Sequence, residues 1–365
     1  MEENKKPEIT PEAIEELKPN QLPKKSFIKR FWWVGIIIVV AVVGIIVIAL
    51  FFHKDTSKPK TSSQTVSLKK TNTATIPDAI NPVNPKAIPV GDGNVSSSSP
   101  KNGSIYACQI PGGGGGGNGT GPWLNKTTKT WDSTTKTAVS GAVAWPSANY
   151  QVSVSQNNRI ITGNDLPING QTTGVYPIQK TDKAYMYDGN PNKIASQTIS
   201  LTLPLQPSAA SKPGCLNMDS IGILSDGVVL FNGLDGESRD AAVYETLDSC
   251  DGHPQQSSEY HHHNIPSCIL AKHNTPNTSS LVGYANDGYG IYVERDSRGN
   301  LLTNANLDEC HGRTSSILWD GKRIDMYHYV ATIEYPYTLG CFHGTSQVKQ
   351  TTPAMGPRQG PPPPR

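Results

Sequence analysis

The sequence predicts a mostly β fold, a strand-rich sandwich-like or mixed ectodomain behind one N-terminal transmembrane helix. Two observations predict the β class. Short alternating or β-branched runs recur over residues 105–346, separated by Gly, Asn, Asp and Pro. In the same region only Ser238 to Leu247 keeps a helical period. A third observation, an uncharged apolar run near the N-terminus, predicts the anchor.

The apolar run extends from Phe31 to Phe52 and contains no Asp, Glu, Lys or Arg. At helical rise it is long enough to cross a hydrocarbon core of ~30 Å. It exceeds the ~7–15 residues of a signal-peptide core, and no small-residue cleavage pattern follows, so we expect a retained helix. Basic residues flank both ends, with a narrow excess on the N-terminal side. The positive-inside rule therefore places residues 1–30 in the cytoplasm as a short tail.

The segments on either side of the β-rich region are predicted to lack stable structure. Residues 53–104 are rich in Ser, Thr, Lys, Pro and Asn and contain few large apolar side chains to offset the entropy of ordering. We interpret them as a disordered stalk. Residues 347–365 end in a proline run and are interpreted as a disordered tail. The glycine run Gly112 to Gly117 lacks a following Lys-Ser or Lys-Thr and is a flexible loop rather than a phosphate-binding loop.

The strands of the β-rich region are expected in the following order, with Asp226-Gly227 and Asp296 to Asn300 as hairpin turns. They are Tyr150 to Val154, Thr198 to Leu203, Ile221 to Leu224, Val228 to Phe231, Gly290 to Val293 and Tyr329 to Ile333.

All six cysteines follow the apolar run, and none precedes it. An even set on one side of a membrane fits an oxidising exterior and predicts an extracellular domain. The alternative is free or metal-bound cysteines in a reducing compartment, and no CxxC pair of the zinc-ribbon kind supports it. Six cysteines allow fifteen pairings. Cys250 with Cys268, and Cys310 with Cys341, would close loops beside the histidines.

Eight of the nine histidines lie between His253 and His343. In an extended segment His261 and His263 point to one face, while Tyr260 and His262 point to the other. Such a His-x-His pair offers two imidazole nitrogens to one cation, and a third ligand from a neighbouring strand would complete a three-histidine site. His328, in another strand-like run, is the expected third ligand.

His311 and His253 are further candidate ligands, although a single histidine more often satisfies a buried carbonyl than a metal. Imidazole suits zinc, copper, iron and nickel, and we expect zinc or copper. In a catalytic version the cation would activate a water molecule, with Glu259, Asp287 or Glu309 as base.

Several ordered motifs make the chain resemble the bacterial and archaeal YHYH-domain family from about residue 150 to 344. In this chain His262 stands where the motif has its second tyrosine, and the later copy ends in Val330 where a histidine would complete it. The resemblance implies an exported, strand-rich domain and supplies no substrate. The motifs that carry it are Cys250 to Pro254, Tyr260 to His263, Val282 to Tyr292, Asp308 to Gly312, Met326 to Tyr329, Tyr335 to Tyr337 and Gly340 to Phe342.

The sequence thus predicts a single-pass cell-membrane protein whose external domain binds a transition metal. A metal-dependent hydrolase is the first alternative. The second is an adhesion or glycan-binding module with a flat tyrosine surface. The near-neutral charge and the absence of a basic, aromatic-interleaved stripe give nucleic-acid binding no support. The tyrosines of the second alternative are Tyr284, Tyr289, Tyr292, Tyr327, Tyr329, Tyr335 and Tyr337.

Overall fold

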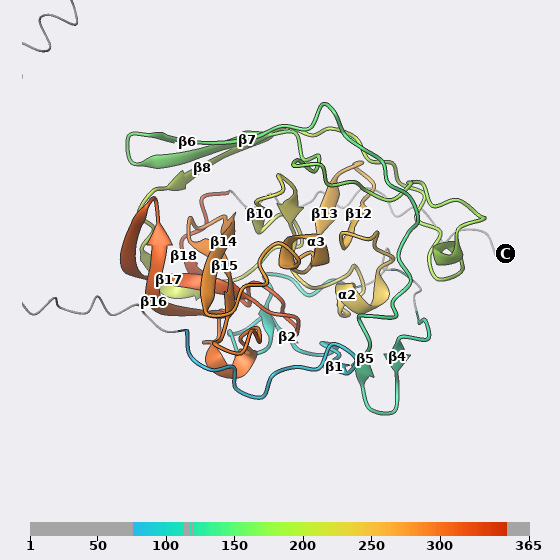
Figure 1. Ribbon diagram of the computed structural model, residues 1–365, viewed down its shortest axis with the longest axis horizontal. Helices are drawn as coiled ribbons and strands as arrows, with labels where there is room; N and C mark the ends of the chain where they lie inside the picture. The colour runs from blue at the N-terminus through green and yellow to red at the C-terminus, as the bar shows by residue number, and fades with distance from the viewer. Residues whose placement is uncertain (1–75, 113–116, 118–119, 349–365) are drawn as a thin grey trace, which may run out of the picture. The chain divides into compact units, whose positions relative to one another are not determined.

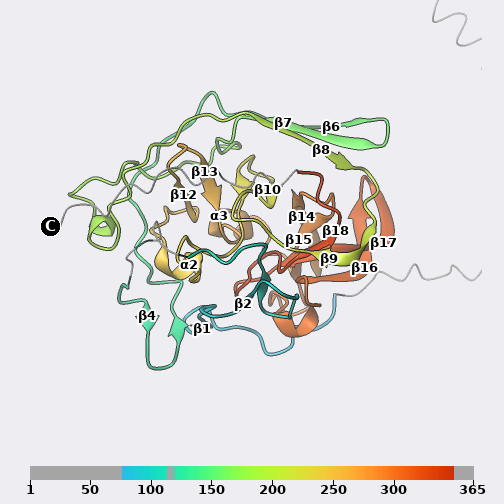
Figure 2. The same cartoon turned by 180° about the vertical axis from the view of Figure 1, so that it is seen from behind.

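The computed structural model describes residues 76–112, 117 and 120–348. Figure 1 shows their path, and Figure 2 shows the same chain from behind. The predicted cytoplasmic tail, the apolar run Phe31 to Phe52 and the stalk as far as residue 75 lie outside the described residues. Within the described ranges no helix is both long and apolar enough to cross a membrane.

A mixed eight-stranded sheet forms the centre of the domain. Neighbouring strands pair antiparallel except at two places, where β11 pairs with β13 and β15 pairs with β17 in parallel. In spatial order the strands are β12 (Gly252–Pro254), β13 (Tyr260–His262), β11 (Val229–Leu230), β10 (Gly222–Leu224), β14 (Thr278–Ala285), β15 (Gly290–Arg295), β17 (Lys322–Ala331) and β16 (Gly312–Trp319).

Four smaller sheets and a few single-turn helices complete the described structure. One three-stranded sheet contains β6 (Tyr150–Ser155), β7 (Asn158–Gly163) and β8 (Ile199–Pro204), and the other contains β1 (Ile88–Pro89), β5 (Thr130–Trp131) and β4 (Leu124–Asn125). The two-stranded sheets pair β2 (Val95–Ser96) with β3 (Ile105–Tyr106) and β9 (Ala209–Gly214) with β18 (Phe342–Gly344). The helices are η1 (Lys183–Met186), α2 (Ala241–Tyr244), α3 (Ser267–Leu270) and η2 (Asn304–Asn306).

Both faces of the central sheet are buried, and strand alternation explains how. In β15, Ile291 and Val293 pack into the larger core cluster, whereas Tyr292 between them packs into a second cluster. The second cluster contains Ile161 and Leu203 from the β6–β7–β8 sheet, which therefore covers that face. The fold is mostly β with few helices, as the residue pattern predicts.

Residues 76–104 belong to the folded domain, which corrects their interpretation as a disordered stalk. Ile88 is 1% exposed and lies in the main core. The backbone N–H groups of Ala79 and Gly91 donate to the buried carboxylates of Asp296 and Asp240. Composition missed this order because a few apolar residues, each placed against a distant part of the chain, are sufficient to hold an irregular segment.

The two predicted turns are confirmed, and the two suggested cysteine pairs are found together with a third pair that the sequence left open. Asp226-Gly227 joins β10 to β11, and the Asp296 N–H donates to the Asn300 carbonyl across the second predicted turn. The expected helix from Ser238 shortens to the four residues of α2, because Ser238 takes a left-handed φ of 62° in a turn. The disulfides are Cys250–Cys268, Cys310–Cys341 and Cys108–Cys215.

Candidate metal centre

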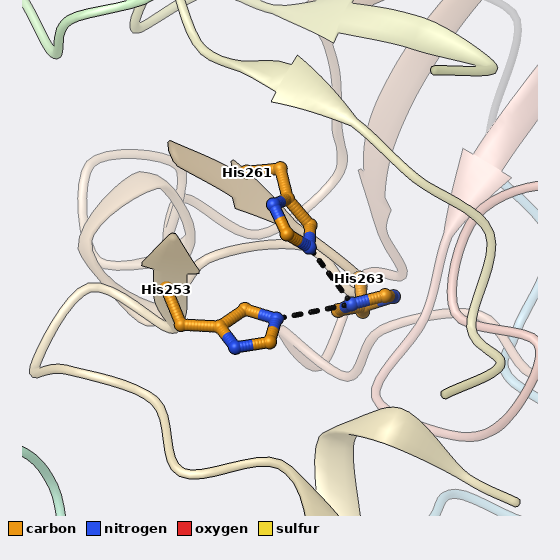
Figure 3. A group of neighbouring side chains, drawn as sticks. All are labelled: His253, His261 and His263. Atoms are coloured by element: carbon orange, nitrogen blue, oxygen red, sulfur yellow. Dashed lines mark hydrogen bonds between the residues drawn. The ribbon is translucent and has the colours of Figure 1, made fainter. Parts of the chain in front are cut away.

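Three histidines meet at one edge of the central sheet, on the adjacent strands β12 and β13. His253 lies directly opposite His261 in the antiparallel register, and His263 follows the last residue of β13. Figure 3 shows the three rings directed toward one another. Because side chains alternate along a strand, His261 and His263 share a face, while His262 turns to the other face and contacts Asp226. The alternation expected for this segment is therefore found.

The Nε2 atoms of the three rings converge. Nε2 of His263 lies 3.1 Å from Nε2 of His261 and 3.2 Å from Nε2 of His253. The three residues are only 6%, 3% and 5% exposed, for His253, His261 and His263 respectively. We call these three residues the histidine triad.

Hydrogen bonds at the far side of two rings determine which nitrogens carry hydrogen. Nδ1 of His263 lies 2.6 Å from the carbonyl oxygen of Asn232, and Nδ1 of His261 lies 3.3 Å from that of Glu259. A carbonyl oxygen can only accept, so both Nδ1 atoms donate. In the neutral rings the two Nε2 atoms then present lone pairs to each other at 3.1 Å with no hydrogen between them. Only a cation or a shared proton satisfies that contact.

A tetrahedral cation fits the spacing. Zinc–imidazole bonds of about 2.0–2.1 Å place two ligand nitrogens about 3.3–3.4 Å apart. The observed Nε2 separations of 3.1 and 3.2 Å are close to that value. The backbone carbonyls that hold Nδ1 are the kind of outer partner that orients metal-bound histidines. The triad therefore has the donor atoms, the spacing and the orientation of a three-imidazole metal site.

The electrostatic environment keeps the triad uncharged near neutral pH. Burial, with smaller contributions from neighbouring histidines, holds the pKa of His253 and of His261 well below 6.5. Burial likewise lowers the pKa of His263 to about 4. A neutral imidazole is the form that binds a metal ion.

Two neighbours shape the triad further. The Phe231 ring stacks on His261 with centroids 4.1 Å apart and fixes the plane of that imidazole. The Glu245 carboxylate lies 3.7 Å from Nδ1 of His253, and burial raises the pKa of this carboxyl to about 8.

A cavity of about 240 Å³ lies near this edge, lined by Lys136, Asp248 and Asp251 among others, but no triad residue lines it.

His328 does not join the triad, contrary to the expectation from sequence. In β17 its Nε2 lies 3.2 Å from the Glu294 carboxylate, and its Nδ1 lies 3.0 Å from the Met326 carbonyl oxygen. His253, ranked lower from sequence, is the third member because its strand pairs directly with β13. Pairing of β12 with β13 depends on tertiary structure, and only the nearness of the two segments in sequence could have indicated it.

The other candidate ligand, His311, does not belong to the triad. His311 is buried with Nε2 3.2 Å from Thr332 Oγ1, and burial lowers its pKa to about 3. A second group of possible ligands contains Asp226, Cys250 and His262. Because Cys250 is bonded to Cys268, its sulfur is not available as a thiolate. We therefore assign no metal to that group.

None of the three carboxylates proposed as bases contacts the triad through its side chain. Asp287 accepts hydrogen bonds from the Tyr329 hydroxyl at 2.6 Å and the Gly344 N–H at 2.8 Å. The Glu259 side chain bonds to Gln255, and Glu309 is exposed to solvent.

The tyrosines of the proposed adhesion surface are buried. Each of the seven is at most 8% exposed, and their hydroxyls and rings pack inside the domain. A flat recognition surface requires exposed rings, so the structure corrects that interpretation. In β-rich segments tyrosine is compatible with either a core or a surface, and the sequence alone could not distinguish them.

Comparison with known protein families finds one match. Residues 200–300 match the family described as YHYH protein, the family that the motifs resemble. The matched segment contains all three members of the triad, whereas His328 lies outside it. Comparisons with curated proteins and with solved structures give no significant match.

Proposed function

We propose that this chain, which contains a YHYH domain, binds one transition-metal ion through Nε2 of the histidine triad. The observation that carries the proposal is the pair of opposed lone pairs on His261 and His263, each fixed by a carbonyl at the other ring nitrogen. Burying two acceptors against each other without a donor is costly, and a cation at the common point removes the cost. The remaining imidazole, that of His253, completes the ligand set.

Zinc or copper is the metal that suits these donors. The ligands are three imidazoles, and all six cysteines are engaged in disulfides, so soft thiolate ligation is not offered. Hard cations such as calcium prefer oxygen ligands, and no triad member supplies one. Disulfides in the domain are consistent with an extracellular location, and we propose that the apolar run Phe31 to Phe52 anchors it there.

Metal binding is better supported than hydrolysis. A metal-dependent hydrolase needs a base within hydrogen-bond reach of a metal-bound water, and the carboxylates expected in that role have other partners. The carboxylate of Glu245 faces Nδ1 of His253 rather than the convergent Nε2 atoms.

The test is elemental analysis of the untagged full chain, purified after export through an oxidising compartment and reconstituted with zinc or copper. We expect about one ion per chain in the wild type and less than a tenth of that in a His261→Ala/His263→Ala variant. His273→Ala is the matched control, because it removes an imidazole outside the triad and should leave one ion bound. Intact disulfides and an unchanged circular dichroism spectrum establish that the variants fold. A folded wild type without metal overturns the proposal.

The proposed orientation has its own test. Protease treatment of intact cells should remove the domain, because the stalk and the domain lie outside. Survival of the domain under conditions that strip other surface proteins would contradict an external location.

A further inference from the structure

The eight-stranded sheet consists of two halves with the same plan. Counted outward from the middle, one half is β10, β11, β13 and β12, and the other is β14, β15, β17 and β16. In each half the first two strands form an antiparallel hairpin, the second and third are parallel, and the third and fourth are antiparallel.

The junction between the halves has matching register. Across β10 and β14, Ile223 lies opposite Tyr284, with Gly222 opposite Ala285 on one side and Leu224 opposite Gly283 on the other. Exchanging the two halves converts the pair Gly222–Ala285 into the pair Leu224–Gly283 and leaves the pair Ile223–Tyr284 in place. A pseudo-twofold axis therefore passes through the pair of Ile223 and Tyr284.

The hairpin turns repeat the same hydrogen bonds. Asp226 Oδ1 accepts from the Val228 N–H as Asp287 Oδ1 accepts from the Tyr289 N–H, and the glycine between has φ of 88° in one copy and 93° in the other. Beyond the hairpin, Asp235 Oδ1 accepts from two N–H groups of its own turn, and Asp296 Oδ1 does the same.

The loop before each histidine strand is also repeated, atom for atom. Asp248 Oδ1 accepts from the N–H groups of Cys250 and Gly252 and from the Tyr260 hydroxyl. Asp308 Oδ1 accepts from the corresponding groups of the other half, at 3.0, 2.9 and 3.1 Å. Those groups belong to Cys310, Gly312 and Tyr327. In both copies the cysteine of this loop forms a disulfide with a later cysteine.

The repeat makes His328 the counterpart of His261. Both rings place Nδ1 on the carbonyl of the residue two positions earlier, and both pack against the aromatic residue at the same point of the parallel neighbour, Phe231 or Tyr292. The surroundings differ. Arg313 stands opposite His328 where His253 stands opposite His261, and Val330 replaces His263.

In the second half, the corresponding imidazole contacts a buried carboxylate. Glu294 places one oxygen 3.2 Å from Nε2 of His328 and the other 2.8 Å from Nη1 of Arg313. The side chains of Glu294 and His328 are 0% exposed. The counterpart of Glu294 in the first half is Gly233, which has no side chain, and a Cβ there would lie 3.3 Å from the rings of Tyr335 and Tyr337.

We infer that the sheet is a duplicated histidine-bearing unit in which the second copy holds the Glu294 carboxylate between His328 and Arg313 where the first copy binds a metal. This inference rests on the proposed function of the triad. The inference predicts one metal ion per wild-type chain. It also predicts that three substitutions should create a second metal site in the second half.

The test converts the second half into the first with Glu294→Gly, Arg313→His and Val330→His in the full chain. Zinc or copper stoichiometry by elemental analysis should rise by about one ion per chain over the wild type. The same variant with His328→Ala added is the control and should return to the wild-type value. A folded triple variant with wild-type stoichiometry overturns the inference. A wild type without metal would contradict the proposed function. An ion gained by the triple variant would support the duplication even in that case.

A reciprocal exchange decides the matter if the triple variant fails to fold. Gly233→Glu, His253→Arg and His263→Val in the first half should abolish metal binding and build the ion pair around His261. Its melting temperature should exceed that of Gly233→Glu/His253→Ala/His263→Val measured without metal, because both variants share the crowding at residue 233 and only the first gives the buried carboxylate an arginine partner. A melting temperature at or below that of the alanine variant counts against the inference.

Discussion

At the scale of single residues, the partners of an imidazole determine its role more than its own position does. His261 and His328 occupy equivalent strand positions, and each has a carbonyl acceptor two residues earlier and an aromatic neighbour at the equivalent position. His261 nevertheless faces two other imidazoles, whereas His328 faces a carboxylate. Neutral donors that converge suit a metal ion, and a carboxylate beside an imidazole suits a shared proton.

Replacing Glu294 with Gln should destabilise the fold in a pH-dependent way. Burial alone would raise the pKa of Glu294, but the hydrogen bonds and charges of His328 and Arg313 outweigh it and lower the pKa below 4.5. A lowered carboxyl pKa stabilises the folded state above the unfolded pKa, and this contribution disappears as pH falls through the folded value. At neutral pH, removing one partner of a buried pair costs about 3–5 kcal/mol.

Urea unfolding between neutral and acidic pH measures this effect. The difference in free energy of unfolding between wild type and Glu294→Gln should be largest near neutrality and should shrink as pH falls below about 4.5. Glu237→Gln, at a partly exposed ion pair with Arg239, is the control and should change stability by less than about 1 kcal/mol. A difference that stays constant with pH would show that Glu294 is not ionised in the fold.

At the scale of elements, short strands and irregular segments are ordered by partners far away in the chain. Ile88 lies in a two-residue strand and packs into the main core, and the backbone around Gly91 is held by the Asp240 carboxylate. The composition of the segment resembles that of a linker, because the segment contains little apolar surface and its partners are distant in sequence.

Ile88→Ala in the full chain should therefore lower the free energy of unfolding by about 2–5 kcal/mol, the usual cost of truncating a buried isoleucine. Ile80→Ala is the matched control, since Ile80 is 48% exposed and should change stability by less than about 0.5 kcal/mol. Chemical denaturation compares the two. Equal stability in both variants would restore the interpretation of residues 76–104 as a stalk.

At the scale of the whole molecule, the two halves of the sheet share a plan and differ in what stabilises their outer edges. A disulfide holds each half, between Cys250 and Cys268 or between Cys310 and Cys341. At the first edge three buried imidazoles form the proposed cation site, while at the second edge the chain itself supplies a carboxylate for His328 and Arg313.

Removal of metal by a chelator should therefore act on one half. A ligand that binds only the folded state stabilises the region that holds it. Amide hydrogen exchange followed by mass spectrometry should show protection of β12 and β13 falling at least about tenfold on chelation, with β16 and β17 changing less than about twofold. Equal loss of protection in both halves would contradict a single site at the first edge.

Several features of this fold could be predicted because they depend on neighbours in sequence. Strand alternation placed His261 and His263 on one face, and the Asp-Gly pair specified the turn between β10 and β11. The recurrence of Asp-Gly, Asp-x-Cys-x-Gly and Tyr-His in the same order was also present in the sequence, and it would have indicated the repeat. The second Tyr-His is the same position in another copy and not part of the same site, which is why His328 does not belong to the triad.

By itself the sequence determined the β class and the two same-face imidazoles, since each follows from local geometry, whereas it left the pairing of the six cysteines open. Only the tertiary structure decided that His253 completes the triad and that the tyrosines are buried. It also decided that His328 contacts Glu294, which in turn contacts Arg313. Strand order and register bring those groups together. Both depend on packing across the whole domain, which no local pattern of residues specifies.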